Sequence, residues 1–422
     1  DFSALPAFDR ITPSDVAPAL DVLLARANQA LETVTAPDFA ARWSDIAAVL
    51  AVATEQLGRS WGVVSHLNSV ADTPELRAAY NAALPLVTEF WTRLGADERL
   101  YAKYKQMDPA ALTPEQRQAH KNAMRGFVLG GAELQGAAKE RFAAIQERSA
   151  ALAQKFSENT LDATDRWAYY ATAEEMQGIP VDVQQVARTA AQAEGKDGFK
   201  LTLKIPCYLP VMQFAKRADL REKLYRAFVT RASEQAEGDA RKFDNTALIN
   251  EILALRKEEA QLLGYANFGE VSVVPKMAKS PAEVIHFLRD LAHRARPYAE
   301  KDVADLRAFA AEHLNLPDPQ PWDWPYVAEK LKEARYAFSE QELRQYFPAP
   351  KVLAGLFKII ETLFEVAIRS DQAPVWHPAV EFYRIERDGQ LVGQFYLDLP
   401  ARNGKRGGAW MDDVRTRWLR PD

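Results

Sequence analysis

The sequence predicts a mainly α-helical fold with a small β-sheet late in the chain. Four segments combine a hydroxyl residue, a proline and a nearby acid or amide, and they begin at Thr12, Thr73, Thr113 and Ser280. Such a hydroxyl accepts a hydrogen bond from a free backbone N–H of the first helical turn, and proline is favoured at the first helical position. A β-hairpin pattern around Asp388 and Gly389 accounts for the sheet.

Two of the predicted helices are long and carry an apolar stripe. After Ser280, apolar residues recur at three- and four-residue steps, which indicates one helix with a single buried face. The members of this stripe are Ile285, Leu288, Ala292, Ala295, Ala299, Val303, Leu306 and Ala310. Residues 141–163 have the same pattern, and the side chains on their apolar face are Phe142, Ile145, Leu152 and Phe156.

Two regions change to a period of two residues, which is typical of strands. Residues 199–205 alternate apolar and polar side chains, so we expect a half-buried strand that stops at Pro206. Residues 380–385 and 391–399 are two β-rich runs on either side of Asp388-Gly389. Because this dipeptide tolerates the positive φ angles of a tight turn, the two runs predict a β-hairpin.

Length and composition restrict the classes of protein. The chain has 422 residues, 48% of them apolar, which is more than one core usually contains, so we expect two or three packed units. The formal net charge of -5 is spread along the chain without a basic block, which argues against a nucleic-acid partner. Cys207 is the single cysteine, which excludes an internal disulfide and favours the cytoplasm.

The sequence gives no sign of a membrane segment or of a leader. No apolar run reaches the roughly 18 to 20 residues that span a bilayer, so no membrane partner is expected. The chain begins with Asp1 and its first residues lack the basic and apolar regions of a signal peptide. Because the first residue is not Met, a leader that has already been removed stays an open alternative.

No metal site can be predicted from the histidines, which are His66, His120, His286, His293, His313 and His377. None stands in H-E-x-x-H, the helical spacing that brings two imidazoles to one zinc ion. His286 and His293 share a helix face but are about 10 Å apart at the α-helical rise, so we interpret them as ordinary, partly exposed residues. We interpret His66 as a hydrogen-bonded packing residue and His377, which precedes a proline, as part of a turn.

Two further patterns near the end of the chain have simple interpretations. Asp412 and Asp413 suggest a general acid/base pair, but neighbours in a strand point to opposite faces, so one salt-bridged and one exposed acid is favoured. Residues 404–408 are rich in glycine and basic side chains. They lack the G-x-x-x-x-G-K-[ST] spacing of a phosphate-binding loop, and we reject that interpretation.

The segment Gly407-Gly408-Ala409-Trp410 is a candidate peptide-binding strand. Two glycines and an alanine after the hairpin leave a backbone with almost no side-chain cover, which another backbone can approach closely. An extended peptide can add to such an edge through main-chain hydrogen bonds that do not depend on its sequence. From composition alone, a tight glycine turn packed on the core is the favoured alternative.

The same region carries a long and specific resemblance. Residues 393–399 (GQFYLDL) and 401–413 (ARNGKRGGAWMDD) resemble the G-x-F-Y-x-D-L-x-A-R-x-x-K-R-G-G-A-W-M-D-D run of the thimet oligopeptidase / oligopeptidase A family of zinc oligopeptidases. The match is closer to bacterial oligopeptidase A than to dipeptidyl carboxypeptidase, which departs at Asp412-Asp413. Further similar stretches lie at 64–70, 225–233, 251–256, 322–323, 346–348 and 355–357. The likeness therefore covers essentially the whole chain, with departures at Pro400 and Val414.

The resemblance implies a multi-helical clam-shell with a deep channel, in which a zinc-activated water cleaves short peptides. In this family the H-E-x-x-H zinc helix comes after the Gly-Gly-Ala-Trp segment, so we expect this chain to end before it, with no catalytic or metal-ligating residue of its own. By analogy with other zinc peptidases, Gly407, Gly408, Ala409 and Trp410 are the expected substrate-binding residues, since they would align the substrate backbone beside the zinc.

The resemblance also gives an expected division of the chain and of its partners. Residues 1–150 would form an N-terminal helical domain that makes one channel wall, and residues 151–422 the N-terminal part of the catalytic domain. Short peptides are the expected partners, together with the missing C-terminal part as a separate fragment. The alternative function is a catalytically incomplete helical peptide-binding fragment. Against it, residues 397–410 would then be half of a sheet with an unpaired edge.

Overall fold

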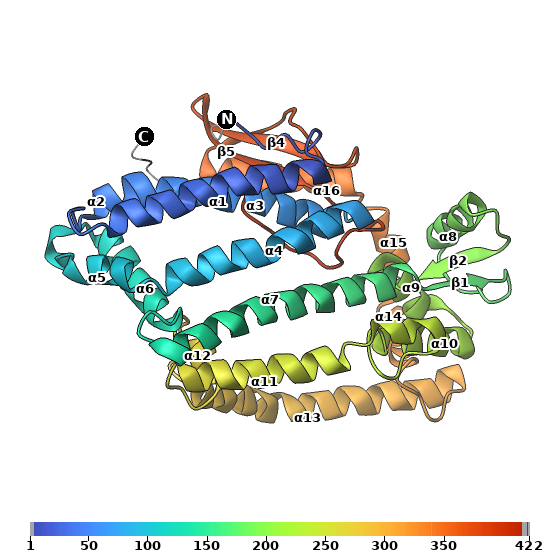
Figure 1. Cartoon of the computed structure of the whole chain (residues 1–422). Helices are drawn as coiled ribbons and strands as arrows, with labels where there is room; N and C mark the ends of the chain where they lie inside the picture. Colours follow the sequence, from blue (N-terminus) through green and yellow to red (C-terminus); the bar gives the residue numbers. More distant parts are fainter. Residues whose placement is uncertain (1–3, 339, 416–419, 421–422) are drawn as a thin grey trace. The chain divides into compact units, whose positions relative to one another are not determined.

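The computed structural model describes residues 4–338, 340–415 and 420, and most of these residues lie in helices (Figure 1). The predicted mainly α-helical class with a small late sheet is confirmed. Backbone contacts divide the described residues into two units. Unit 1 lies within Asp1–Glu158, Asn245–Arg289 and Gly404–Asp422, and unit 2 lies within Asn159–Asp244 and Asp290–Asn403.

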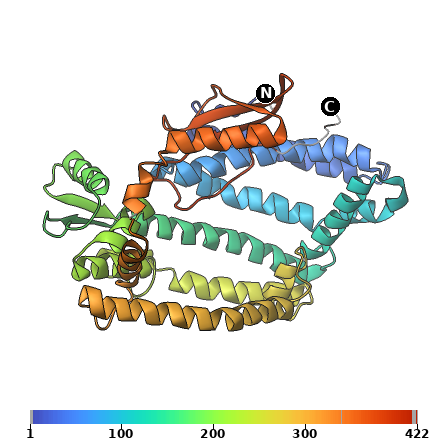
Figure 2. The same cartoon turned by 180° about the vertical axis from the view of Figure 1, so that it is seen from behind.

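Unit 1 is built from helices. Its elements are α1 (Pro13–Thr35), α2 (Trp43–Ile46), the π-helical turn η1 (Ala47–Ala51), α3 (Val52–Val70), α4 (Pro74–Gly95), α5 (Glu98–Gln106), the 3₁₀ turn η2 (Pro109–Ala111), α6 (Pro114–Leu129), most of α7 (Gly136–Asp165), α11 (Thr246–Leu262), α12 (Phe268–Val273) and the start of α13 (Pro281–Leu314). In Figures 1 and 2, α1, α3 and α4 lie side by side.

The four predicted helix starts are confirmed. The hydroxyl groups of Thr73, Thr113 and Ser280 each accept a hydrogen bond from the backbone N–H three residues later, with distances of 3.2, 3.3 and 3.1 Å. At the fourth start, the carboxylate of Asp15 accepts from the backbone N–H of Thr12 at 2.7 Å. These bonds satisfy donors at the helix start that would otherwise lack a partner, which is why a local sequence pattern locates them well.

Apolar contacts hold the helices of unit 1 together. Leu20 of α1 and Leu57 of α3 are 2% and 0% exposed and belong to a core shared with α4. Ile145 and Leu152 of α7 pack with Leu255 of α11. The apolar stripe predicted for residues 141–163 is therefore buried, as expected, at Phe142, Ile145 and Leu152.

Unit 2 mixes helices with two small antiparallel sheets. Its elements are the end of α7, β1 (Ala168–Ala171), α8 (Val181–Ala193), β2 (Phe199–Thr202), α9 (Ile205–Phe214), α10 (Ala218–Val229), the 3₁₀ helix η3 (Gly238–Phe243), most of α13, α14 (Trp324–Tyr336), α15 (Glu340–Arg344), α16 (Ala349–Phe364), β3 (Ala367–Ser370), β4 (Glu381–Arg387) and β5 (Gln390–Leu397). Strands β1 and β2 pair with each other, and the second sheet has the order β3-β4-β5.

The predicted hairpin is β4 and β5. Arg387 pairs with Gln390, and the two residues between them, Asp388 and Gly389, have φ angles of 49° and 75°. Positive φ at both central positions is what a two-residue turn between right-twisted strands requires. Helix α16 covers one face of this sheet (Figure 2), where the ring of Phe357 lies 4.9 Å from that of Tyr383.

The strand predicted over residues 199–205 is shorter than expected. Strand β2 ends at Thr202, and Ile205 begins α9 with Pro206 in its first turn. Proline suits the first turn of a helix as well as it ends a strand, so the same residue marks a helix start here. The alternating pattern was therefore extended three residues too far.

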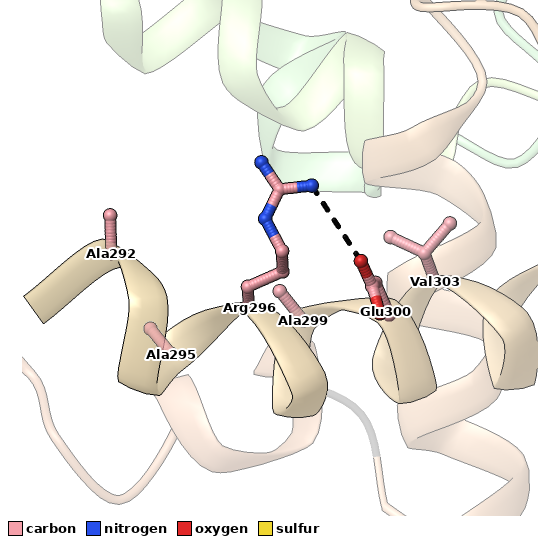
Figure 3. A pocket seen from close by; sticks show the side chains of 6 residues that line it. All are labelled: Ala292, Ala295, Arg296, Ala299, Glu300 and Val303. Atoms are coloured by element: carbon pink, nitrogen blue, oxygen red, sulfur yellow. Dashed lines mark ion pairs between the residues drawn. The ribbon is translucent and has the colours of Figure 1, made fainter. Parts of the chain in front are cut away.

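Helix α13 is confirmed, but the burial of its stripe was predicted wrongly. Ala310 is the only buried residue of α13, whereas Ile285, Leu288 and Val303 are 48%, 54% and 42% exposed. Figure 3 shows the middle of this face, where small side chains and Val303 line a shallow hollow beside the Arg296–Glu300 ion pair of 3.7 Å. These side chains are therefore about half exposed, although their spacing is that of a buried face.

Candidate functional site

The candidate peptide-binding segment lies after the end of β5, and an ion pair fixes the exit from that strand. The guanidinium of Arg402 donates to the carboxylate of Asp398 at 2.7 and 2.8 Å, and the indole N–H of Trp376 donates to the same carboxylate at 3.0 Å. Both partners of the ion pair are largely buried, at 15% and 10% side-chain exposure. Such two-point contacts restrict orientation as well as distance.

The next residues pair with the C-terminal end of α3 through the main chain. The backbone N–H of Asp72 donates to the carbonyl of Gly404 at 3.0 Å, and the backbone N–H of Arg406 donates to the carbonyl of Ser69 at 2.8 Å. Gly404 has φ of +71°, and a Cβ atom there would lie 2.7 Å from the carbonyl oxygen of Asp72. Glycine is therefore required at this position for both conformation and space.

Gly407, Gly408 and Ala409 lie on the surface after this anchor. All three are exposed, and a Cβ atom built on either glycine would meet no atom within 4 Å. The structure assigns no strand to residues 407–411, so the predicted strand is absent from the described chain. A strand exists only where a second strand completes its hydrogen bonds, and none of the described strands pairs with this segment. The predicted role in binding a peptide stays a prediction.

Trp410 is fixed by a short row of rings. Its indole lies edge-on against the imidazole of His66, with centroids 5.9 Å apart and an interplanar angle of 67°. His66 in turn lies 5.5 Å from the ring of Phe8. Edge-to-face pairs at such distances are favourable beyond the area they bury. His66 is half-buried and packs on both rings, so the packing part of its interpretation is confirmed, while the hydrogen-bonding part stays a prediction.

A polar network holds the end of α3 that carries this anchor. The Asp72 carboxylate pairs with the guanidinium of Arg77, whose Nε lies 3.1 Å from Oδ2, and accepts from the amide of Asn68 at 3.2 Å. Gln154 of α7 donates to Asn68 at 3.4 Å and to Glu158 at 3.3 Å. These contacts join α3, the start of α4 and α7, so the turn after α3 is held from three sides.

The remaining candidate residues are each described by their own surroundings. His286 and His293 are exposed on α13, as expected. Asp412 and Asp413 are both exposed, and the salt bridge expected for one of them stays a prediction. His377 does shape a turn, since its Nδ1 accepts from the backbone N–H of Ala379 at 3.1 Å. Across residues 4–338, 340–415 and 420, no group of three or more His, Cys, Asp or Glu side chains could hold a metal ion.

The sequence did not predict the contact between the end of α3 and residues 404–410. Ser69 and Asp72 contribute backbone groups, whose partners leave no trace in a residue pattern. The usable signal was Gly404, which lies before the Gly407-Gly408 pair. Its positive φ and its close approach to the backbone of Asp72 explain why this residue is a glycine.

Among the helices that the structure describes, none is long and apolar enough to cross a bilayer.

Two family models match the chain. The model of peptidase family M3 matches residues 211–420, and the model of the neurolysin/thimet oligopeptidase N-terminal domain matches residues 20–139. The first match contains the anchor at Gly404 and the exposed glycines, and the second contains α3 with His66, Ser69 and Asp72.

Individual relatives agree with both matches. Oligopeptidase A of Salmonella typhimurium is 43% identical over 417 residues, which are 97% of this chain and 61% of the relative. Oligopeptidase A of Escherichia coli is 42% identical over 416 residues, with the same two shares. Dipeptidyl carboxypeptidase of Salmonella typhimurium is 27% identical over 419 residues, or 96% of this chain and 60% of the relative.

The chain thus spans about 61% of the length of the oligopeptidases that it matches. Within that span the similarity is continuous and includes both the helices of unit 1 and the sheet with its glycine segment. The predicted resemblance is confirmed, and the chain belongs to peptidase family M3, the family of thimet oligopeptidase and oligopeptidase A.

Proposed function

We propose that the full product of this gene is a zinc metallo-oligopeptidase that hydrolyses short peptides inside a deep channel. Membership of peptidase family M3 and the identity to two proteins named oligopeptidase A support this function. Gly407, Gly408, Ala409 and Trp410 bind the substrate in this proposal. Their task is to align the main chain of the peptide, not to take part in the bond-breaking step.

The observation that carries the proposal is the combination of exposure and anchoring in this segment. Gly407 and Gly408 expose their backbone with no neighbour within 4 Å of a Cβ position, while Gly404 and Arg406 are fixed to α3. An extended peptide that adds to a backbone edge needs free N–H and C=O groups held in place before binding. Side chains contribute little at such an edge, which suits an enzyme that accepts many peptide sequences.

Zinc does not fit the residues described here. The described part of the chain contains no cluster of three or more metal-binding side chains, and His286 and His293 lie seven positions apart on the exposed face of α13. We propose that the zinc ligands lie outside these residues, in the part of the relatives that the present chain does not span. The residues described here therefore bind and orient the substrate and do not supply the metal.

The remaining parts of the proposal concern organisation and location. Residues 1–150 form one wall of the channel, and residues 151–422 form the beginning of the catalytic domain. The protein acts in the cytoplasm, which agrees with a single cysteine in the chain. A C-terminal part, either continuous with the chain or bound as a separate fragment, supplies the metal.

The test is a cleavage assay on the full gene product with quenched fluorescent peptides. We expect hydrolysis of short peptides, no hydrolysis of a folded protein that contains the same cleavable sequence, one zinc per chain by elemental analysis, and loss of activity with a chelator that zinc restores. Binding of peptides without hydrolysis, in a sample that holds no zinc, would support the alternative of a catalytically incomplete peptide-binding protein. Neither binding nor hydrolysis would overturn both.

A further inference from the structure

The end of α3 lies against the proposed substrate-binding segment. Three contacts join them: Asp72 to Gly404 at 3.0 Å, Arg406 to Ser69 at 2.8 Å, and the ring contact between His66 and Trp410. They lie on both sides of the exposed glycines 407 and 408. The segment is therefore fixed before and after its free stretch, while the stretch itself stays open.

We infer that the C-terminal turn of α3 is the positioning element of the substrate-binding segment, and that His66 is a positioning residue for Trp410. This inference rests on the proposed peptidase function and goes further, because it assigns a role in substrate alignment to residues of the N-terminal helices. The main-chain hydrogen bonds of Ser69 and Asp72 fix the distance between the segment and α3. The imidazole of His66 fixes the orientation of the Trp410 indole.

Rigidity of the turn is what makes it suitable for this role. Asp72 is held by Arg77 and Asn68, and the side chain of Asp72 is only 7% exposed. Behind it, Glu158 of α7 is 9% exposed and accepts from the amide of Asn81 of α4 at 2.7 Å. A buried polar network of this kind restrains the backbone that carries it, so the anchor points move little.

Gly404 gives the inference a specific test. An alanine at this position would bring its Cβ to 2.7 Å from the carbonyl oxygen and 3.3 Å from the nitrogen of Asp72, both backbone atoms. The segment must then move away from α3, because the turn after α3 is held in place. Gly264 is the matched control, since it lies in the same unit, has φ of +81° and would place a Cβ in open space. Gly404→Ala and Gly264→Ala share the backbone strain and differ in the displacement.

The first measurement is hydrogen exchange of the Arg406 amide, which donates to Ser69. We expect this amide to be protected in the unmodified full gene product and in Gly264→Ala, and to exchange at least about tenfold faster in Gly404→Ala because the bond that protects it is broken. Rapid exchange in the unmodified protein would show that the anchor does not form, and the inference would be overturned whether or not the protein cleaves peptides.

The second measurement is the kinetics of short-peptide hydrolysis by the same three proteins. We expect Gly404→Ala to raise KM about tenfold with kcat changed less, because alignment of the peptide main chain contributes to binding in the ground state as well as in the transition state. Zinc content should be equal in all three. If the unmodified protein cleaves peptides and Gly404→Ala has the KM of Gly264→Ala, the proposed function stands and the inference fails.

His66 offers an independent variant that does not alter the backbone. His66→Ala removes the ring that supports Trp410 and should raise KM in the same direction, whereas His66→Phe keeps a ring of similar size and should restore KM to near its original value. Equal defects in both variants would contradict a positioning role through ring packing. An unmodified protein that cleaves no peptide would remove the proposed function, and the inference with it, even if the exchange experiment showed the anchor.

Discussion

Helices α3 and α13 both carry an apolar face but have opposite surroundings. Leu57 in the first half of α3 is 0% exposed and belongs to a core shared with α1 and α4. Leu288 of α13 is 54% exposed, and Ile285 and Val303 of the same stripe are 48% and 42% exposed. Both helices are well formed. The hydroxyl of Ser280 caps the first turn of α13, and α3 continues directly from η1.

A hydrophobic pattern predicts the helix and its apolar face, but not whether that face is buried. The period of apolar residues identifies a helix and the face that is apolar, because both depend on the geometry of the helix itself. Whether the face is covered depends on residues far away in the sequence. Helix α16 lies between the two cases, because Phe357 packs on the sheet while Ile359 and Leu363 are 58% and 70% exposed.

Removing one partner of a buried ion pair tests whether unit 2 is loosely packed throughout or only along α13 and α16. Arg221 and Asp323 form a buried ion pair at 2.5 Å, with side chains 1% and 4% exposed. Asp323→Ala leaves the guanidinium buried without its carboxylate, so we expect a loss of about 3 to 5 kcal/mol in the free energy of unfolding, measured by urea denaturation. Asp290→Ala, at an exposed pair with Arg294, is the control and should change stability by less than about 1 kcal/mol. Equal small losses in both would mean that unit 2 is loose as a whole.

The second effect concerns the covered face. Leu57→Ala removes a fully buried side chain from the core of α1, α3 and α4. We expect the free energy of unfolding to fall by about 2 to 5 kcal/mol, because the transfer energy is lost and a cavity remains. Denaturation monitored by circular dichroism measures this. A loss below about 1 kcal/mol would indicate that this core is not packed as described.

The third effect tests a helix N-cap, a local feature that follows the same rule whether or not the apolar face of the helix is covered. Thr113→Ala removes the hydroxyl that accepts from the backbone N–H of Gln116 at 3.3 Å at the start of α6. A stability loss of about 1 kcal/mol is expected, since a free N–H of the first turn loses its partner. Thr113→Ser keeps the hydroxyl and should retain most of the stability. If serine and alanine are equally unfavourable, the methyl group and not the cap is responsible.

The smallest effect concerns the exposed face. Leu288→Ala makes the same chemical change as Leu57→Ala, but on a side chain that is 54% exposed. In the 422-residue chain we expect a change within about 0.5 kcal/mol, because little apolar surface leaves a packed environment and alanine favours the helix. A loss of unfolding free energy comparable to that of Leu57→Ala would show that the apolar face of α13 is covered in this chain. The proposed contrast between α3 and α13 would then be wrong.

The same distinction explains how much of the fold could be predicted. The cap at Thr113 and the turn at Asp388-Gly389 were predicted correctly, because a few adjacent residues determine them. Pro206 was assigned to the wrong kind of boundary, since a proline can end a strand or begin a helix, depending on the residues after it. The burial of α13 was predicted wrongly, because an apolar period cannot reveal whether a distant segment covers the face.

Less of the candidate site could be predicted than of the fold. Gly407, Gly408, Ala409 and Trp410 were identified from bare backbone and from the family resemblance, and the structure adds that the two glycines are open to solvent. Their anchor on α3 was missed, because hydrogen bonds between backbone groups of the two segments carry no residue preference except at Gly404. A contact of this kind becomes visible only when distant segments are placed side by side.

Whether residues 407–409 align the peptide main chain is tested most directly by a crystal structure of the full gene product with a peptide analogue that cannot be hydrolysed. We expect the main chain of the peptide to lie along residues 407–409, with backbone hydrogen bonds between them, while Gly404 and Arg406 keep their bonds to Asp72 and Ser69. A peptide bound elsewhere, with residues 407–410 free of contact, would contradict the account.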